Sequence, residues 1–139
     1  MTDYVALIVT KLGNDWLPAN TSSRTPSVRK IIELTDFNLS NGDFCGVYAG
    51  DESEEPRFIG YNGAKWQTAL SFTLSTAVSH AHLILMRDEA RRVVHAARKT
   101  LTPNALWHWK RAIDVSDKRR GTYKYVCDTQ LELPSELIV

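Results

Sequence analysis

A single apolar stripe between residues 88 and 101 is the feature that most constrains the fold of this chain. Its members recur at the spacing of one helix face: Ala90, Val93, Val94, Ala97 and Leu101. The segment begins with two carboxylates and ends with two cations, an order that suits the helix dipole. It therefore predicts an amphipathic helix that ends before Pro103.

Short apolar and β-branched runs on both sides of this helix predict strands. These runs are Tyr4–Val9, Val28–Thr35, Asp43–Ala49, Arg57–Tyr61, Ala81–Met86 and Thr122–Cys127. Asn41-Gly42 predicts a tight hairpin turn between the second and third runs, because both residues tolerate positive φ. The expected sheet is therefore antiparallel and comes mostly from the N-terminal half.

Turn-forming residues separate these runs. Residues 13–27 are rich in Gly, Asn, Pro, Ser and Thr and predict a long surface loop, within which Trp16 and Leu17 need somewhere to pack. Residues 50–56 include four carboxylates and predict an acidic loop. Residues 64–79 combine helical spacing with many Ser and Thr side chains, so helix and strand both stay open there.

The segment from residue 103 to residue 115 admits two interpretations. With Thr102 as N-cap and Pro103 at the first helical position, residues 103–113 form a short second helix. Alternatively, apolar side chains from Trp107 to Val115 alternate along a strand, and residues 118–121 form a hairpin loop before the next strand. The helix is the favoured interpretation.

These elements predict one α+β domain over residues 1–139, with an antiparallel sheet of about four to five strands and two helices packed on one face. A chain of this length with 43% apolar residues can build an ordinary core. No apolar run reaches the roughly 18 residues of a membrane span, and the N-terminus lacks a basic signal region. We therefore expect no membrane insertion and a cytoplasmic protein, in which Cys45 and Cys127 remain free thiols.

Charge is unevenly distributed along the chain, although its net value is only +1. Residues 87–124 hold 11 basic and 4 acidic side chains, whereas residues 1–86 hold 6 basic and 9 acidic ones. Residues 125–139 hold 3 acidic side chains and no basic one. A charge separation of this kind indicates the chemistry of a partner more than it indicates the fold.

The candidate binding residues lie in the basic segment, on the helix face opposite the apolar stripe and just after the helix. They are Arg91, Arg92, His95, Arg98, Lys99, Trp107, Trp109, Lys110, Arg111, Arg119 and Arg120. Arginine suits phosphate because its guanidinium group binds two oxygens at once, and aromatic rings can stack on nucleic acid bases. The same cations also fit a solvated helix face, or pairing with the acidic loop at 51–55.

Patterns typical of catalysis or metal binding are weaker in this sequence than the basic pattern. His80 and His82 would point to the same face of a strand and could share a metal, if His95 or Asp88 supplied a third ligand. The sequence has no Gly-x-Ser-x-Gly, His-Glu-x-x-His, Gly-x-Gly-x-x-Gly or Walker A pattern. It therefore favours a protein without cofactor, bound metal or enzymatic activity.

Three functional hypotheses follow. The leading one is a small non-enzymatic binding module that engages an anionic partner, nucleic acid or an acidic protein surface, through the basic C-terminal helix face. The second is a protein–protein inhibitor or adaptor that acts by occluding a surface. The third is a small histidine-based or metal-dependent enzyme centred on His80 and His82.

Overall fold

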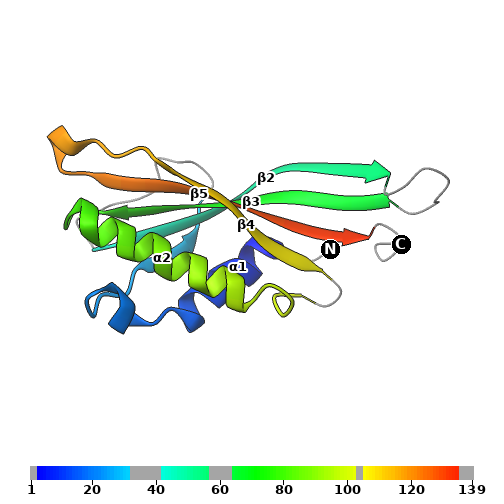
Figure 1. Cartoon of the computed structure of the whole chain (residues 1–139), viewed down its shortest axis with the longest axis horizontal. Coiled ribbons are helices and arrows are strands. Elements are labelled where there is room, and N and C mark those ends of the chain that lie inside the picture. The colour runs from blue at the N-terminus through cyan, green and yellow to red at the C-terminus, as the bar shows by residue number, and fades with distance from the viewer. Residues whose placement is uncertain (1–2, 32–41, 57–63, 103–104, 135–139) are drawn as a thin grey trace.

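The computed structural model of the chain describes residues 3–31, 42–56, 64–102 and 105–134. These residues form two α-helices and one five-stranded sheet, which confirms the prediction of an α+β fold (Figure 1). The elements are α1 (Tyr4–Asp15), η1 (Pro18–Thr21), β1 (Ser27–Lys30), β2 (Phe44–Pro56), β3 (Ala64–Thr76), α2 (His80–Ala96), β4 (Leu106–Asp114), η3 (Lys118–Arg120) and β5 (Tyr123–Pro134). The labels η1 and η3 denote short 3₁₀ helices.

The sheet is mixed, not purely antiparallel, and its strand order is β1-β2-β3-β5-β4. β1 pairs with β2 in parallel, with Ser27 opposite Phe44, whereas the other neighbouring strands are antiparallel. The predicted antiparallel hairpin between these two strands is therefore wrong, because a tight turn cannot join two parallel strands, and Asn41 lies outside the described residues. β4 forms one edge of the sheet, and the short β1 forms the other.

Several segments differ from their predicted structure. Residues 50–56 continue strand β2 and do not form a separate acidic loop. Within the predicted loop at 13–27, the chain completes α1, forms η1 and begins β1. The predicted strand Arg57–Tyr61 lies outside the described residues.

The N-terminal segment forms helix α1 where a strand was predicted. The Asp3 carboxylate caps this helix by accepting a hydrogen bond from the Ala6 backbone N–H at 3.1 Å. Val5, Ile8 and Leu12 recur at helical spacing and are buried along one face. A short apolar run fits a helix as well as a strand, and only the spacing that extends to Leu12 distinguishes them.

Helix α2 contains the predicted apolar stripe but begins earlier than predicted. Ser79 caps it by accepting a hydrogen bond from the His82 N–H at 3.1 Å. Leu83 and Met86 extend the buried face toward the N-terminus, so the predicted strand Ala81–Met86 is wrong. The helix ends at Ala96, before the predicted end at Leu101.

The segment after α2 forms a strand and not the short helix that the sequence favours. Residues 106–114 form β4, so the favoured helix over residues 103–113 is wrong and the alternation of apolar side chains is the correct pattern. Helix η3 then forms the predicted hairpin loop, and Gly121 adopts a φ of 66° that favours glycine. Residues 64–76, where the sequence fits both helix and strand, form β3.

One hydrophobic core joins the helices to the sheet. It contains residues of both helices and of strands β2 to β5, including Ile8, Leu12, Val47, Phe72, Leu83, Met86, Val93, Trp107 and Cys127. In Figure 1, β2, β3 and β5 extend to the right beyond the helices. Among the described residues, no helix has the length and apolar character needed to span a membrane.

Candidate anion-binding surface

The outer face of α2 displays cations because the apolar stripe occupies the opposite face. Arg91, His95 and Arg98 follow one another at helical spacing and are all exposed, and Lys99 follows in the turn after the helix. Arg91 donates a hydrogen bond from Nε to Nε2 of His95 at 3.3 Å. In the described part of the chain, no carboxylate pairs with Arg91, Arg98 or Lys99, so their charge is available to a partner.

Arg92, the fifth candidate on this helix, serves the fold instead. It donates two hydrogen bonds of 2.7 Å to the Glu89 carboxylate and one of 2.7 Å to the Asp15 carbonyl. Glu89 is only 2% exposed and also accepts from the Leu17 N–H and the Asn20 amide. The Arg92–Glu89 pair therefore attaches the segment after α1 to α2. Because Nε and Nη2 of Arg92 already donate to Glu89 and Asp15, its guanidinium group has no free pair of donors for a ligand.

The two candidate tryptophans on β4 are packing residues. Trp107 is 1% exposed, and its indole N–H donates to the Thr129 hydroxyl at 2.8 Å. Trp109 is half-buried, with its ring edge-on to Phe72 at a centroid distance of 6.0 Å. Trp107 is thus closed to base stacking, and the ring of Trp109 already packs edge-on against Phe72. Both predicted stacking roles are therefore poorly supported.

β4 nevertheless adds a cation to the end of α2. The backbone N–H of Trp107 donates to the Arg98 carbonyl at 2.9 Å, so the start of β4 adjoins the end of the helix. Lys110 is an extra residue between Trp109, which pairs with Thr129, and Arg111, which pairs with Asp128; it is a β-bulge on the edge strand. Its side chain is exposed, and no carboxylate of the described chain pairs with it.

The remaining predicted cations lie elsewhere or are already paired. Arg111 donates to the Asp128 carboxylate at 2.8 Å. Arg120 lies 3.6 Å from the Asp117 carboxylate, within the η3 turn at the far end of β4. Its neighbours Lys118 and Arg119 are exposed, and no carboxylate of the described residues pairs with them.

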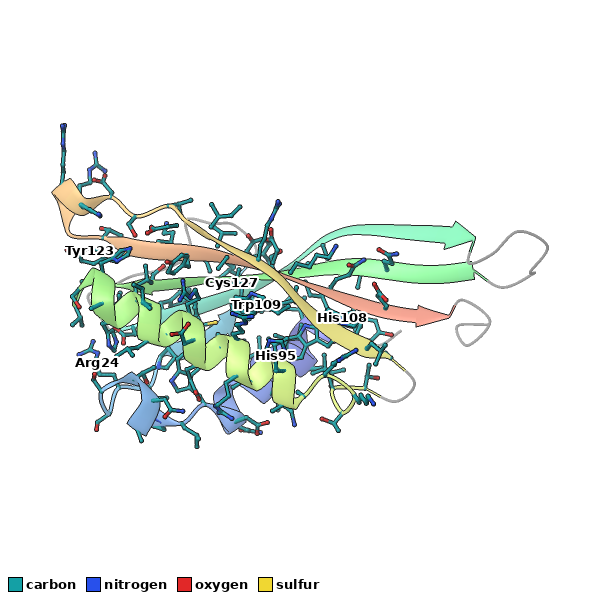
Figure 2. All side chains as sticks on the ribbon, viewed as in Figure 1. Arg24, His95, His108, Trp109, Tyr123 and Cys127 are labelled. Carbon is teal, nitrogen blue, oxygen red and sulfur yellow. The ribbon has the colours of Figure 1, made fainter. Side chains whose placement is uncertain are left out.

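The available cations of the basic segment therefore form two groups, one of which includes Lys118, which is not among the predicted site residues. The helix-end cluster consists of Arg91, Arg98, Lys99 and Lys110, with His95 beside them. The hairpin cluster consists of Lys118 and Arg119. Figure 2 labels His95 on the front helix, and Figure 1 shows the β4–β5 hairpin at the opposite, upper-left end of β4.

His82 does not share a site with His80, because the two residues lie on a helix and not on a strand. Nε2 of His82 lies 2.6 Å from the Asp43 carboxylate, and both side chains are almost completely buried. Asp43 also accepts two hydrogen bonds of 3.1 Å from Arg24 and one of 2.7 Å from Thr76. This network joins the start of β2 to the end of β3 and the first turn of α2.

His80 has a separate partner at the surface. Its Nε2 lies 2.6 Å from the Asp114 carboxylate at the end of β4. Hydrogen bonds from Ser116 and then from His80 lower the pKa of Asp114 to about 2. The predicted third ligands do not join the two histidines, and the described residues contain no group of three or more side chains that could hold a metal ion.

The buried carboxylates make the fold sensitive to acid. Burial alone would raise the pKa of Asp43, but hydrogen bonds from Arg24, His82 and Thr76 outweigh it, and the pKa is lowered. The pKa of Glu89 is likewise lowered, because bonds from Arg92, Leu17 and Asn20 outweigh the opposing effect of burial. A lowered pKa in the folded state gives stability that is complete above the ordinary value and lost as the pH falls below it.

We therefore expect the urea midpoint of unfolding to fall as the pH drops below the ordinary pKa values of 3.8 for Asp and 4.5 for Glu. Urea titrations at several pH values between about 7 and 3 measure this effect. The Glu89→Gln variant should show a shallower decline, because one titrating group is gone. A midpoint that stays constant down to pH 3 would contradict the assignment.

No protein-family model matches the sequence, and no curated protein is similar to it. The functional argument therefore depends on the geometry of this chain alone.

Proposed function

We propose that the protein is a non-enzymatic binding module that engages an anionic partner through the helix-end cluster. The supporting observation concerns four exposed cations that have no carboxylate partner within the described chain: Arg91, Arg98, Lys99 and Lys110. The neighbouring Arg92 and Arg111, in contrast, each pair with a carboxylate. Arginine and lysine side chains bind phosphate and carboxylate oxygens most strongly when no internal carboxylate competes. The buried free thiols Cys45 and Cys127 fit action in a reducing compartment such as the cytoplasm.

The arrangement favours electrostatic attachment over recognition of individual bases. Arg91 lies on α2, Arg98 and Lys99 in the turn directly after it, and Lys110 on the edge strand β4, so most of the backbone that carries these cations is already ordered before binding. Of the two tryptophans on β4, Trp107 is enclosed and Trp109 packs on Phe72. Contacts of this kind set affinity and its dependence on salt, with little selectivity for sequence.

Charge reversal on α2 tests this proposal directly. The double variant Arg91→Glu/Arg98→Glu should bind a labelled duplex oligonucleotide roughly 10- to 100-fold more weakly than the wild type at about 50 mM salt, because two contacts become repulsive. Both side chains are exposed, so the thermal midpoint of unfolding should change little. Fluorescence anisotropy measures the affinity.

The matched control is Lys11→Glu/Lys30→Glu, which changes the net charge by the same amount on α1 and β1. Lys11 and Lys30 each pair with a surface carboxylate, at 3.1 Å and 3.6 Å, and neither belongs to α2 or β4. The affinity of this control variant for the same duplex should stay within a few-fold of the wild-type affinity. Equal weakening in both double variants would indicate a general charge effect and would remove α2 from the site.

A further inference from the structure

Strand β4 forms an edge of the sheet, and the rest of the described chain closes only the beginning of that edge. There the Trp107 N–H points away from β5 and donates to the Arg98 carbonyl at 2.9 Å, so the turn after α2 covers this end. From the β-bulge onward, every residue up to Val115 is exposed except the half-buried Ala112. We call residues 110–117 the open edge.

The backbone of the open edge has hydrogen-bonding groups that point away from β5. In an antiparallel pair, the groups of successive residues point alternately toward and away from the partner strand. The Val115 N–H donates to the Lys124 carbonyl at 2.9 Å, so the backbone groups of Ile113 also point toward β5. Ala112 and Asp114 therefore present their N–H and C=O groups outward, where no backbone group of the described residues bonds to them. An edge of this kind is a template for another strand.

The charges of the open edge are complementary to a second copy of the same segment. Two cations lie at its beginning, Lys110 and Arg111, and two carboxylates lie toward its end, Asp114 and Asp117. Antiparallel pairing with an identical segment places the cationic end of each copy beside the acidic end of the other. Parallel pairing in register would instead bring like charges together, which destabilises a strand pair.

The internal partners of these charged groups leave room for the second copy. The Asp114 carboxylate pairs with His80 and that of Asp117 with Arg120, but the two carboxylates are still 36% and 52% exposed. Lys110 has no carboxylate partner in the described chain. Cations of one copy can therefore approach the acidic end of the other without breaking a buried pair.

An exposed apolar side chain lies between the two charged ends. Ala112 pairs with Cys127 and both belong to the core, so the side chain of Ile113 lies on the opposite face of the sheet. Ile113 is 43% exposed. A two-fold axis through Ile113 brings the Ile113 side chains of two copies together on that face. The same axis pairs the outward groups of Ala112 in each copy with those of Asp114 in the other.

We propose that two copies of the protein associate by antiparallel pairing of their open edges, with Ile113 on the two-fold axis, so that one continuous sheet crosses the dimer. This inference goes beyond the function proposed above and does not depend on it. Arg91 lies on α2, and Arg98 and Lys99 lie directly after it, all outside the paired segment. The dimer therefore carries two copies of these anion-binding cations.

Sedimentation velocity at protein concentrations from about 1 to 500 µM tests the proposal. The wild type should change from monomer to dimer within this range, because the interface is short. Ile113→Lys should weaken dimerisation about tenfold or more, since two like charges then meet at the axis. The matched control Leu17→Lys also places a lysine at an exposed apolar position, 51% exposed and outside β4, and should dimerise like the wild type. Thermal unfolding shows that both variants are folded.

Oxidative cross-linking tests the register. Directly opposite residues on antiparallel strands have Cβ atoms about 4.5–5.5 Å apart, which suits a disulfide. Ile113→Cys should therefore give a disulfide-linked dimer under mild oxidation. The control Val115→Cys lies two residues from the axis, so its two copies are roughly 13 Å apart and should cross-link several-fold less. The native thiols Cys45 and Cys127 are buried in both variants.

Three results would overturn the inference. The first is a wild type that stays monomeric over the whole concentration range. The second is a folded Ile113→Lys variant that dimerises as strongly as the wild type, which would place the contact elsewhere. The third is equal cross-linking at positions 113 and 115, which would rule out a two-fold axis at Ile113.

Discussion

Replacing Asp43 with alanine should lower the free energy of unfolding by about 3–5 kcal/mol, because it leaves His82 buried without its partner. The Asp43 and His82 side chains are 1% and 4% exposed, and they lie 2.6 Å apart. The change also removes the acceptor for Arg24 and Thr76. Urea unfolding at neutral pH measures the loss.

A matched surface variant shows whether this effect comes from burial. The Asp88 carboxylate also pairs with an arginine, at 2.9 Å, but it is 57% exposed. Asp88→Ala should therefore change the stability by less than about 1 kcal/mol. If Asp43→Ala and Asp88→Ala have equally small effects, the buried network contributes little and the account of this region is wrong.

Replacing Trp107 with alanine should destabilise the fold by a similar amount, about 3–5 kcal/mol, because it leaves a large cavity in the core and removes the hydrogen bond from the indole to the Thr129 hydroxyl. Trp109→Ala should cost clearly less, since its ring is only half-buried. The Trp107→Phe variant should fall between wild type and Trp107→Ala. Thermal or urea unfolding gives these differences.

The Trp107→Phe variant also separates packing from binding. At a temperature where Trp107→Phe is fully folded, its affinity for duplex DNA should equal that of the wild type, because the ring faces the core. A large loss of affinity in this folded variant would show that the indole contacts the partner. The structural assignment of Trp107 would then be contradicted.

The sequence predicted the apolar face of α2 well, because that pattern depends only on local spacing. Ala90, Val93, Val94 and Ala97 are all buried, as their periodicity indicates. The shorter run at residues 4–9 was assigned to a strand, although its helical nature depends on continuation through Leu12. Composition favoured a strand there, and the packing of the whole of α1 decides the outcome.

The parallel pairing of β1 with β2 could not be inferred from local turn chemistry. Asn41-Gly42 is a frequent hairpin dipeptide, but strand direction depends on which strands meet across the sheet. Ser27 opposite Phe44 is a pairing of this long-range kind. Local sequence is also insufficient for β4, because both a helix and a strand fit the pattern of this segment. The long-range pairing with β5 selects the strand.

The sequence shows which cations the candidate site contains, but not which of them pair with carboxylates of the same chain. The sequence identifies the cations of the basic segment, but its favoured interpretation places Lys110 and Arg111 on a helix and not on β4, and it could not show which cations have internal partners. Arg111 and Asp128 meet across two strands, and His82 and Asp43 are 39 residues apart in the chain. Only the tertiary fold therefore distinguishes the available cations from the structural ones, and it reveals Asp43 and Glu89 as residues that fix the fold.

The dependence of DNA affinity on salt tests the central claim most directly. For a duplex of about 20 base pairs between roughly 50 and 200 mM salt, log affinity should fall linearly with log salt, with a slope that corresponds to about four to six phosphate contacts. Arg91→Glu/Arg98→Glu should lower the magnitude of that slope by about two. Affinity that is independent of salt, or the same slope in the double variant, would contradict binding through the helix-end cluster.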